Sequence, residues 1–401
     1  MTDVILTLNA GSSSIKFSAY ALRGAELELL ALGQVDGIGA EAHFTVTPTG
    51  GAKQAVPLDG HVGRRQALSA VIDWLEKEEA GARIVAVGHR VVHGGPDYAA
   101  PMIVTPEHIE QLRRFEPLAP LHQPYNLAGI EAALHEFPDA LQVACFDTGF
   151  HRAHPYIADI FALPRRFYDE GVRRYGFHGL SYEYISRRLR EIAPKLAAGA
   201  VIIAHLGNGA SLCALRDGKS VSSTMGFSAL DGLPMGTRCG QLDPGVLLYL
   251  MAEKNMSAAE ISDLLYKESG LKGLSGISND MRELEASPQP EAAEAIAYFI
   301  SRLKREIGGL AAALGGLDAL VFTGGIGENS ERVRAAAISD MQWMGVELDP
   351  AANAAHAQEI TTPQSRVKAL VLKTDEERMI AEHVAEVLGL QPNSSEAGAA
   401  A

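Results

Sequence analysis

The sequence is poor in cysteine, and its cysteines have no diagnostic spacing. Cys145, Cys213 and Cys239 are three in number and form no Cys-x-x-Cys pair. An odd, scattered set does not suit a disulfide framework. We therefore expect reduced, buried thiols and a cytoplasmic protein.

Long apolar runs and an excess of positive charge are also missing. The best apolar stretch, 310–322, is interrupted by Gly315, Gly316 and Asp318, so it falls short of the roughly 18 residues of a membrane span. No basic and apolar leader precedes Val4, so no secretory signal is expected. The 35 Lys and Arg against 49 Asp and Glu give a net charge of −14. This balance argues against nucleic acid or an anionic membrane as the main partner.

The 401 residues are enough for two or three domains, and 47% of them are apolar. Strand patterns alternate with helical ones, which predicts a soluble α/β protein. The small, polar tail 392–401 is expected to be disordered. Extended segments are predicted at about 3–8, 15–22, 26–35, 43–48, 83–92, 141–146, 200–224, 319–322 and 367–373, and helices at about 62–79, 106–115, 124–136, 181–192, 244–254, 257–268, 290–314 and 375–388.

Three glycine-rich turns, each following a short apolar run, are the most informative feature of the chain. They span 8–14, 205–211 and 323–329. Glycine tolerates positive φ and lets backbone N–H groups approach an anion closely. Three such turns predict a nucleotide that is held from two sides, and hence phosphoryl transfer.

None of these turns is a Walker A loop. Gly218-Lys219-Ser220 has the ending of that motif, but Cys213 stands where its first glycine is required. Asp217-Gly218 lies between alternating runs and is predicted to be a hairpin turn instead.

The first two glycine turns look like copies of one unit, a strand, a glycine and serine turn, and a second strand. The second strands are 15–20 and 211–216. A repeat nearly 200 residues apart implies two similar domains, each presenting one phosphate-binding hairpin to a shared cleft. We expect the last helix to return to the first domain, which then comprises 1–148 and 377–401, with 149–376 as the second.

A series of motifs runs from Asn9 to about Ala381. They are 8–17, 88–95, 145–148, 175–179, 205–211, 235–238 and 323–329. In these motifs and their order the chain resembles the acetate kinases, members of the actin/sugar-kinase/heat-shock ATPase superfamily. The resemblance implies two duplicated ribonuclease-H-like domains around a central nucleotide cleft. It also implies a homodimeric cytoplasmic enzyme that reversibly transfers the γ-phosphoryl group of ATP to acetate with Mg²⁺, or Mn²⁺, giving acetyl phosphate and ADP.

Four residues form the catalytic set that this resemblance implies. Planar guanidinium groups match both carboxylate and phosphoryl oxygens. By resemblance, Arg90 and Arg238 hold the acetate carboxylate and the migrating phosphoryl group. Asp147 orients the site through an arginine, although it could simply cap the turn that follows it. His178 donates to the transferring phosphoryl group, although a lone histidine is more often structural.

The acyl pocket is expected around Arg90 and five further residues. Many acetate kinases have proline where this chain has Ala229, which could enlarge the pocket and let propionate react slowly. One methylene in an apolar pocket discriminates by only about 1–3 kcal/mol. A propionate or butyrate kinase is therefore the nearest alternative, and a heat-shock-type ATPase module or a sugar kinase a more distant one. The five residues are Val92, Leu121, His122, Phe177 and Ala229.

Nucleotide contacts are expected from the glycine turns and from the segment 280–282. Asp280 has an alternative role as a helix N-cap. The expected residues are Ser12, Lys16, His205, Leu206, Gly207, Asn208, Gly209, Asp280, Met281, Arg282, Gly325, Ile326, Gly327, Glu328 and Asn329.

The resemblance also implies that Asn9 and Glu376 bind the metal, with Glu377 as the alternative. A capping box Thr374-x-x-Glu377 would occupy Glu377 and leave Glu376 available. A second box, Ser257-x-x-Glu260, opens an earlier helix.

Two further observations complete the sequence reading. The segment Leu180-Ser181-Tyr182 departs from the threonine-serine-histidine common in the family. The long apolar helix at 290–314, together with the family, favours a homodimer.

Overall fold

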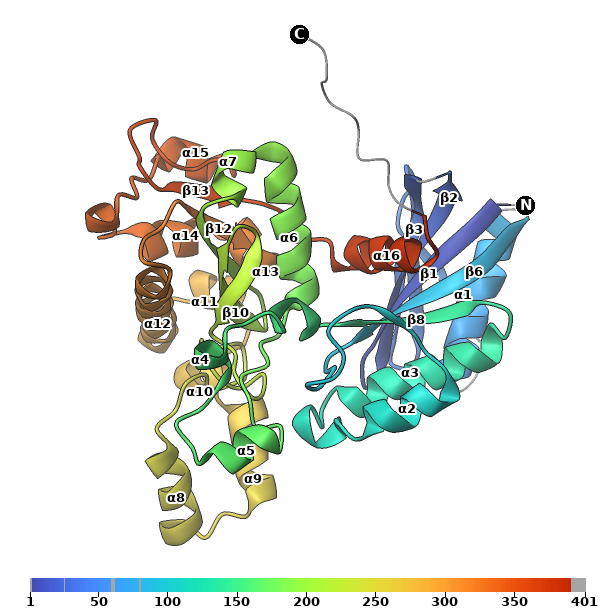
Figure 1. Cartoon of the computed structure of the whole chain (residues 1–401), viewed down its shortest axis with the longest axis horizontal. Helices are drawn as coiled ribbons and strands as arrows, with labels where there is room; N and C mark the ends of the chain where they lie inside the picture. The colour runs from blue at the N-terminus through green and yellow to red at the C-terminus, as the bar shows by residue number, and fades with distance from the viewer. Residues whose placement is uncertain (1, 25, 59–61, 79–80, 391–401) are drawn as a thin grey trace. The chain divides into compact units, whose positions relative to one another are not determined.

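The computed structural model describes residues 2–390 except 25, 59–61 and 79–80. The chain forms two compact units (Figure 1). Unit 1 contains the described residues up to Gly149 and those from Asp375 onward, and unit 2 is Phe150–Thr374. The division expected from the sequence has its breaks after 148 and 376.

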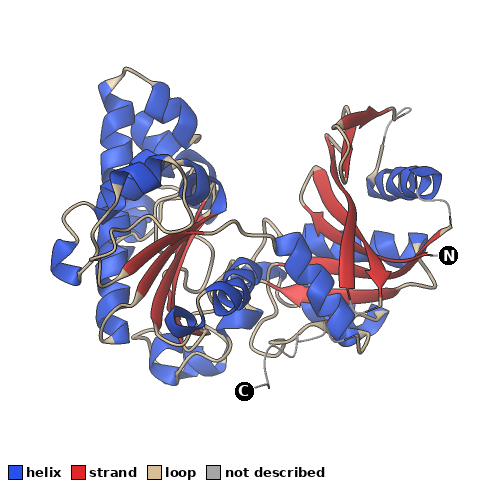
Figure 2. Ribbon diagram, turned by 90° about the horizontal axis from the view of Figure 1, so that it is seen from above, coloured by secondary structure: helices blue, strands red, loops and turns tan. Residues whose placement is uncertain are grey.

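Unit 1 is built on an eight-stranded sheet of order β5-β4-β3-β2-β1-β6-β8-β7. β1 pairs antiparallel with β2 and parallel with β6, and β6 pairs parallel with β8. Figure 2 shows the strands of this sheet and its helices. The strands are β1 (Thr2–Ala10), β2 (Ser14–Arg23), β3 (Glu26–Asp36), β4 (His43–Pro48), β5 (Gln54–Val56), β6 (Ala82–Val91), β7 (Met102–Ile103) and β8 (Leu141–Phe146).

Helices cover both faces of this sheet because its central strands are buried on both sides. Val87 packs in the core cluster with α1 (Arg64–Glu78) and α3 (Gln123–Glu136). The next residue, Gly88, faces α16 (Glu376–Val387), and a Cβ there would lie 2.5 Å from Cγ2 of Ile380. Successive strand residues point to opposite faces, so α16 lies opposite α1 and α3. α2 (Pro106–Arg113) packs on α3.

Unit 2 repeats the central five strands of unit 1. Its sheet has the order β11-β10-β9-β12-β13, with β9 antiparallel to β10 and parallel to β12. This arrangement matches β3-β2-β1-β6-β8 strand for strand, which confirms the internal repeat expected from the two hairpins. The strands are β9 (Ala200–Leu206), β10 (Ala210–Arg216), β11 (Lys219–Ser223), β12 (Ala319–Thr323) and β13 (Lys368–Val371).

The two faces of the second sheet are covered by α6 and α12. α6 contributes Ile185 and Leu189 to one core cluster. The 25-residue α12 buries Phe299, Leu303 and Ile307, whose spacing keeps them on one side of the helix, and it contacts β9 and β10. The apolar face that favoured a dimer in the sequence is thus used inside unit 2. The helices are α4 (Tyr156–Asp159), α5 (Arg165–Asp169), α6 (Gly179–Ile192), α7 (Pro194–Ala197), α8 (Pro244–Glu253), α9 (Ala258–Asp263), α10 (Gly270–Ser275), α11 (Met281–Ala286), α12 (Pro290–Leu314), α13 (Gly324–Asn329), α14 (Glu331–Ile338) and α15 (Pro350–Ala354).

Two local motifs are confirmed. Asp217 and Gly218, with φ of 50° and 69°, form the β10–β11 hairpin turn, so Gly218-Lys219-Ser220 is not a phosphate loop. Ser257 and Glu260 form a capping box at α9.

Two local expectations were wrong. The third glycine turn is the start of α13, because Gly324 at φ 75° turns the chain sharply out of β12 into a helix. Asp375, not Thr374, caps α16 by accepting from the Arg378 N–H. The helix expected at about 375–388 is present as α16, which ends at Val387, and residues 391–401, with the expected disordered tail, lie outside the described residues.

No helix in the described part of the chain has the length and apolar character needed to cross a membrane.

Candidate active site

Three charged residues of unit 1 converge at one edge of its sheet. Arg90 lies near the end of β6, and Asp147 directly follows the parallel neighbour β8. Nη2 of Arg90 donates to Oδ2 of Asp147 at 2.7 Å, and its Nε lies 3.1 and 3.2 Å from the two carboxylate oxygens. Oε2 of Glu376, in the first turn of α16, lies 3.6 Å from the same Nε. The expected pairing of Asp147 with an arginine is therefore present.

This cluster carries more negative than positive charge. Asp147 is 1% exposed, and burial raises its pKa above the ordinary value, against the opposing effect of the Arg90 guanidinium. Burial and the neighbouring Glu376 likewise raise the pKa of Glu377. Buried carboxylates in excess over their cationic partner are stabilised by a further cation.

The oxygen donors of this region suit a magnesium ion. Asn9 lies near the end of β1, which contacts α16, and Glu376 stands at the start of that helix. Mg²⁺ is held by one or two protein oxygens together with phosphates and water. Among the described residues no group of three or more His, Cys, Asp or Glu could hold a metal. Since Asp375 caps α16, the capping argument that set Glu377 aside does not hold, and the choice between Glu376 and Glu377 as metal ligand stays a prediction.

The β1–β2 turn of unit 1 is tied down by two residues that sequence reasoning missed. Nη2 of Arg64 donates to the carbonyl oxygens of Gly11 and Ser12, both at 2.7 Å. Nδ2 of the buried Asn126 donates to Ala10 O, and its Oδ1 accepts from the Val92 N–H. Asn126 therefore connects this turn to the strand that carries Arg90. A buried amide inside an apolar helix pattern is the signal that could have found it.

The expected acyl-pocket residues belong to both units. In unit 1, Val92 is 7% exposed and Leu121 is 38% exposed, while His122 caps α3 and lowers the pKa of Asp147 by its charge. In unit 2, Phe177 is buried and Ala229 lies in the loop before Arg238. The pocket as a whole stays a prediction.

His178 of unit 2 sits in a strained turn at the start of α6. It is the N-cap, with φ 58° and ψ 25°, a left-handed conformation that costs a non-glycine residue energy. Nε2 of His151 lies 2.9 Å from the carbonyl oxygen of Phe177, the preceding residue. The ring of His178 stacks on that of His205, with centroids 4.3 Å apart. Oγ of Ser181 lies 2.8 Å from Nδ1 of His205.

The glycine hairpin between β9 and β10 packs against both expected catalytic side chains of unit 2. A Cβ on Gly209 would lie 2.8 Å from Nη2 of Arg238 and 3.2 Å from Nε2 of His178. Nη1 of Arg238 donates to Ala229 O at 2.9 Å. Arg238 and His178 thus lie against one turn, and glycine is required there because of that close approach.

A cavity of about 700 Å³ borders the same hairpin, a size and a lining that suit a nucleotide. Eight expected nucleotide contacts line it, together with three residues that the sequence reading did not name. The eight are Gly207, Asn208, Asp280, Met281, Arg282, Gly325, Ile326 and Asn329, and the three are Asn279, Glu285 and Ser330.

Two of the expected nucleotide contacts face the interior of unit 2 instead of the cavity. Gly327 is buried, and Oε1 of Glu328 accepts from the Gly324 N–H at 2.9 Å and the Thr374 N–H at 3.1 Å. In a helix, residues 325, 326 and 329 share a face that 327 and 328 do not, which explains the division. Asp280 caps α11 through the Arg282 N–H, as the alternative reading proposed, and still lines the cavity.

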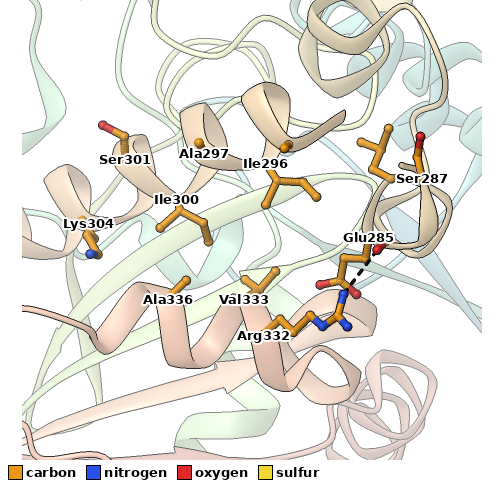
Figure 3. Close-up of a pocket in the computed structure, with 12 residues that line it drawn as sticks. Glu285, Ser287, Ile296, Ala297, Ile300, Ser301, Lys304, Arg332, Val333 and Ala336 are labelled. Carbon is orange, nitrogen blue, oxygen red and sulfur yellow. Dashed lines mark hydrogen bonds between the residues drawn. The ribbon is translucent and has the colours of Figure 1, made fainter. Parts of the chain in front are cut away.

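A larger cavity of about 760 Å³ lies between α11, α12 and α14 (Figure 3). Its floor is apolar, with Ile296 and Ile300 opposite Val333. Of the cations that line it, Lys304 pairs with Asp340 at 3.2 Å, and Arg332 donates to the carbonyl oxygen of Glu285, another lining residue, at 3.2 Å. No glycine turn lines it, so the smaller cavity is the better nucleotide site.

Comparison with known proteins agrees with this geometry. Residues 4–382 match the Acetokinase family.

The chain belongs to the acetokinase family.

The chain is 59% identical to an acetate kinase of Methylocella silvestris, over 97% of this chain and 98% of that protein. An acetate kinase of Nitrobacter hamburgensis is 53% identical over 98% of each chain. Among solved structures, Porphyromonas gingivalis acetate kinase has a TM-score of 0.88 at 38% identity, covering 96% of this chain and 100% of its own. A Francisella tularensis propionate kinase has a TM-score of 0.89 at 35% identity, covering 95% and 98%. The α/β fold of this acetokinase is thereby established along with its family.

Proposed function

We propose that this acetokinase transfers the γ-phosphoryl group of ATP to acetate, reversibly and by direct in-line transfer, giving acetyl phosphate and ADP. It is a phosphotransferase with a carboxyl group as acceptor. The observation that carries the proposal is the paired Arg90 and Asp147 beside Glu376, since Asp147 takes the Nε and Nη2 groups and fixes the guanidinium, whose Nη1 group can then bind the acetate carboxylate. Near-full-length similarity to curated acetate kinases supports the substrate.

In unit 1 the charged cluster prepares the acceptor. Arg90 binds the carboxylate and reduces the repulsion between two anions that must meet. Asp147 keeps the guanidinium in one orientation, because its two oxygens accept from Nε and Nη2. Val92, Leu121 and His122 contribute to acyl binding, and Ser12 and Lys16 to phosphate binding at the β1–β2 hairpin.

In unit 2 the groups around Gly209 stabilise the transferred phosphoryl group. Its charge spreads over three equatorial oxygens in the transition state, so donors fixed beforehand lower the barrier. Arg238 supplies positive charge and His178 a hydrogen bond. His205 and Leu206 support the hairpin, and Phe177 and Ala229 contribute to acyl binding. The 700 Å³ cavity accommodates the nucleotide.

Mg²⁺ is the proposed metal, held by Asn9 and Glu376. A metal ion held there would supply positive charge that neutralises the phosphate oxygens. The carboxylates around Arg90 support this assignment, because burial raises the pKa of both Asp147 and Glu377 and a bound cation would favour their charged forms. Mn²⁺ prefers the same oxygen donors.

Propionate is the second candidate acceptor. Ala229 and the similarity to a propionate kinase at a TM-score of 0.89 favour it as a slower substrate. Val92, which is buried two residues after Arg90 in the chain, favours the smaller acyl group.

We further propose a homodimer in the cytoplasm. None of the ten residues of α8 is buried, although its sequence is largely apolar. Leu248 is 67%, Tyr249 50% and Met251 48% exposed. Such a surface suits a second copy of the chain. Sedimentation should show a dimer for the wild type and a monomer for Leu248→Glu. A wild type that already sediments as a monomer would exclude the dimer.

The test of function is to trap acyl phosphate with hydroxylamine. Purified protein, Mg-ATP and acetate, propionate, butyrate or glycerol are incubated in parallel. Acetate should give the strongest signal and propionate a weaker one. A preference for propionate or butyrate would change the acceptor but keep the mechanism, and ATP hydrolysis without acyl phosphate from any carboxylate would overturn the proposal.

A further inference from the structure

The imidazole of His178 is supported from inside unit 2 by two hydroxyl groups. Nδ1 of His178 lies 2.8 Å from Oγ of Ser211, on β10. Oγ of Ser211 is in turn hydrogen-bonded to the phenol oxygen of Tyr182, on α6. Ser211 and Tyr182 are both 0% exposed. His178, Ser211 and Tyr182 thus form a row that runs from the hairpin into the core.

The direction of the hydrogen bonds in this row follows from Tyr182. Burial raises the pKa of its phenol well above the ordinary value, so the oxygen keeps its hydrogen. Among the hydrogen bonds of the described residues, the one that this phenol makes is with Ser211. A buried hydroxyl hydrogen without an acceptor is costly, so Tyr182 donates and Ser211 accepts.

The hydroxyl hydrogen of Ser211 then remains for His178. A serine oxygen can accept two hydrogen bonds, but its one hydrogen also needs an acceptor. Among the hydrogen bonds of the described residues, the Ser211 hydroxyl meets Tyr182, which is a donor, and Nδ1 of His178, so it donates to Nδ1 of His178. A nitrogen that accepts carries no hydrogen, so the hydrogen of the neutral ring is on Nε2. A Cβ on Gly209 would lie 3.2 Å from Nε2 of His178 and 2.8 Å from Nη2 of Arg238. Both nitrogens therefore lie on the same side of Gly209.

We propose that Tyr182 and Ser211 are positioning residues that hold His178 as the neutral Nε2–H tautomer. The ring then offers a hydrogen-bond donor to the transferred phosphoryl group and does not act as a base toward it. This proposal rests on the phosphoryl-contacting role of His178 proposed above. A third group that fixes the tautomer of a reactive histidine is a general device of enzyme sites.

The backbone around His178 gives this arrangement its rigidity. The left-handed conformation of His178 fixes the exit of the side chain, and His151 holds the preceding carbonyl group. The ring is also stacked on His205. These contacts fix the position of the His178 ring, and the hydroxyl groups of Ser211 and Tyr182 decide which ring nitrogen carries the hydrogen.

The first measurement is the tautomer itself. Protein labelled with ¹⁵N-histidine is studied by long-range ¹H–¹⁵N correlation, with the His178 signals assigned by their loss in His178→Gln. The wild type should have its hydrogen on Nε2. Ser211→Ala and Tyr182→Phe should give a mixture or the opposite tautomer, whereas Tyr184→Phe, which removes a phenol oxygen from the same helix, should leave the signals unchanged.

The second measurement is kinetic. Ser211→Ala and Tyr182→Phe should lower kcat by about 10- to 100-fold, the scale for partners that orient a reactive group, with KM for acetate and ATP changed less than about twofold. In a His178→Gln background the same substitutions should have no further effect on kcat, because the group they position is gone. Thermal unfolding of each variant checks that it is folded.

The outcomes separate this proposal from the proposed function. If His178→Gln is nearly inactive while folded Ser211→Ala and Tyr182→Phe keep full activity and the wild-type tautomer, the positioning role is wrong and the phosphoryl role stands. A wild-type tautomer on Nδ1, or an equal loss of kcat in the His178→Gln background, also overturns the positioning role. Full activity of His178→Gln would instead remove the role of His178 on which both depend.

Discussion

The two units use one strand arrangement to present different chemistry. In unit 1 the ends of β6 and β8 carry Arg90 and Asp147, side chains with charge. In unit 2 the equivalent strand β12 leads into Gly324 and Gly325, and the charged residues that line the cavity there, Asp280, Arg282 and Glu285, come from other segments. The β1–β2 hairpin of unit 1 turns through serines, whereas the β9–β10 hairpin of unit 2 turns through Gly207 and Gly209.

This difference separates what a fold supplies from what a site supplies. The duplicated sheet places strand ends at corresponding positions, but the residues at those ends decide whether they bind by charge or by close backbone approach. Unit 1 gathers charged side chains at its strand ends, whereas unit 2 places Arg238 and His178 against the Gly209 turn. Substitutions in each half should therefore fail in different ways.

The largest effect is expected from removing charge from unit 1. Arg90→Ala should lower kcat/KM for acetate by about 10³-fold or more, the scale of a charge-stabilising arginine in phosphoryl transfer, and Arg238→Ala should do the same in unit 2. Arg83→Ala is the matched control on the same strand, since its pair with Asp3 is exposed and worth little. Steady-state kinetics on folded protein measure this, and near-wild-type turnover of Arg90→Ala would remove it from the catalytic set.

A smaller effect is expected from adding one methyl group to the glycine hairpin of unit 2. Gly209→Ala should lower kcat by about 10- to 100-fold, because its Cβ would displace Arg238 and His178. Gly309→Ala is the control, since a Cβ there meets nothing within 4 Å in the middle of α12. Equal activity of the two variants would show that close approach at Gly209 does not matter.

Stability should fall on acidification because both units bury neutral histidines. Burial lowers the pKa of His89 in unit 1 to about 4, and of His154 in unit 2 to about 4. The unfolded chain therefore binds more protons than the folded one below the ordinary histidine pKa. Stability is complete above about pH 6.5 and is lost as the pH falls toward 4.

His89 alone should contribute about 2 kcal/mol to this loss at pH 5, as an order of magnitude. Denaturant unfolding of wild type and His89→Gln at pH 7.5 and pH 5 measures it. The stability difference between the two proteins should shift in favour of the variant at the lower pH. A difference that is the same at both values would mean that His89 is not a neutral buried group in the folded state.

The smallest effect compares helix caps in the two units. Asp375→Ala at α16 and Ser257→Ala at α9 should each cost about 1 kcal/mol of unfolding free energy, since each side chain accepts from a backbone N–H of the first turn. Chemical denaturation of the two variants tests this. An unchanged stability of Asp375→Ala would speak against it as the cap of α16.

Much of the scaffold could be predicted because its signals are local. Apolar periodicity gave most strands and helices, and Asp217-Gly218 gave a hairpin turn because few residues accept two positive φ values in succession. The repeat was visible in the two hairpins because each copy keeps its strand, turn and strand. The segment 323–329 was predicted to be a turn but begins a helix, because a helix that starts with glycines has the same local composition as a glycine-rich loop.

The finer arrangement of the site could not be predicted, because it depends on contacts between distant segments. Glu328 stands among residues that line the nucleotide cavity, yet its carboxylate binds backbone N–H groups inside unit 2. Asp375 competes with Thr374 for the cap of α16, and only the backbone conformation decides between them. The contacts of Asn126 with Ala10 and Val92 join segments more than 30 residues apart.

The sequence by itself determined the chemistry available to this protein: glycines that let backbone approach a neighbour closely, arginines that can hold carboxylate or phosphate oxygens, and two copies of one strand pattern. Tertiary structure decided which groups face one another. Asp147 binds Arg90 because neighbouring parallel strands end at the same edge of a sheet. Tyr182 reaches Ser211 because α6 packs on the sheet that contains β10. The sequence fixes the residue types, whereas packing fixes which partner each buried polar group meets. The partner matters because burying a polar group without a hydrogen bond costs free energy.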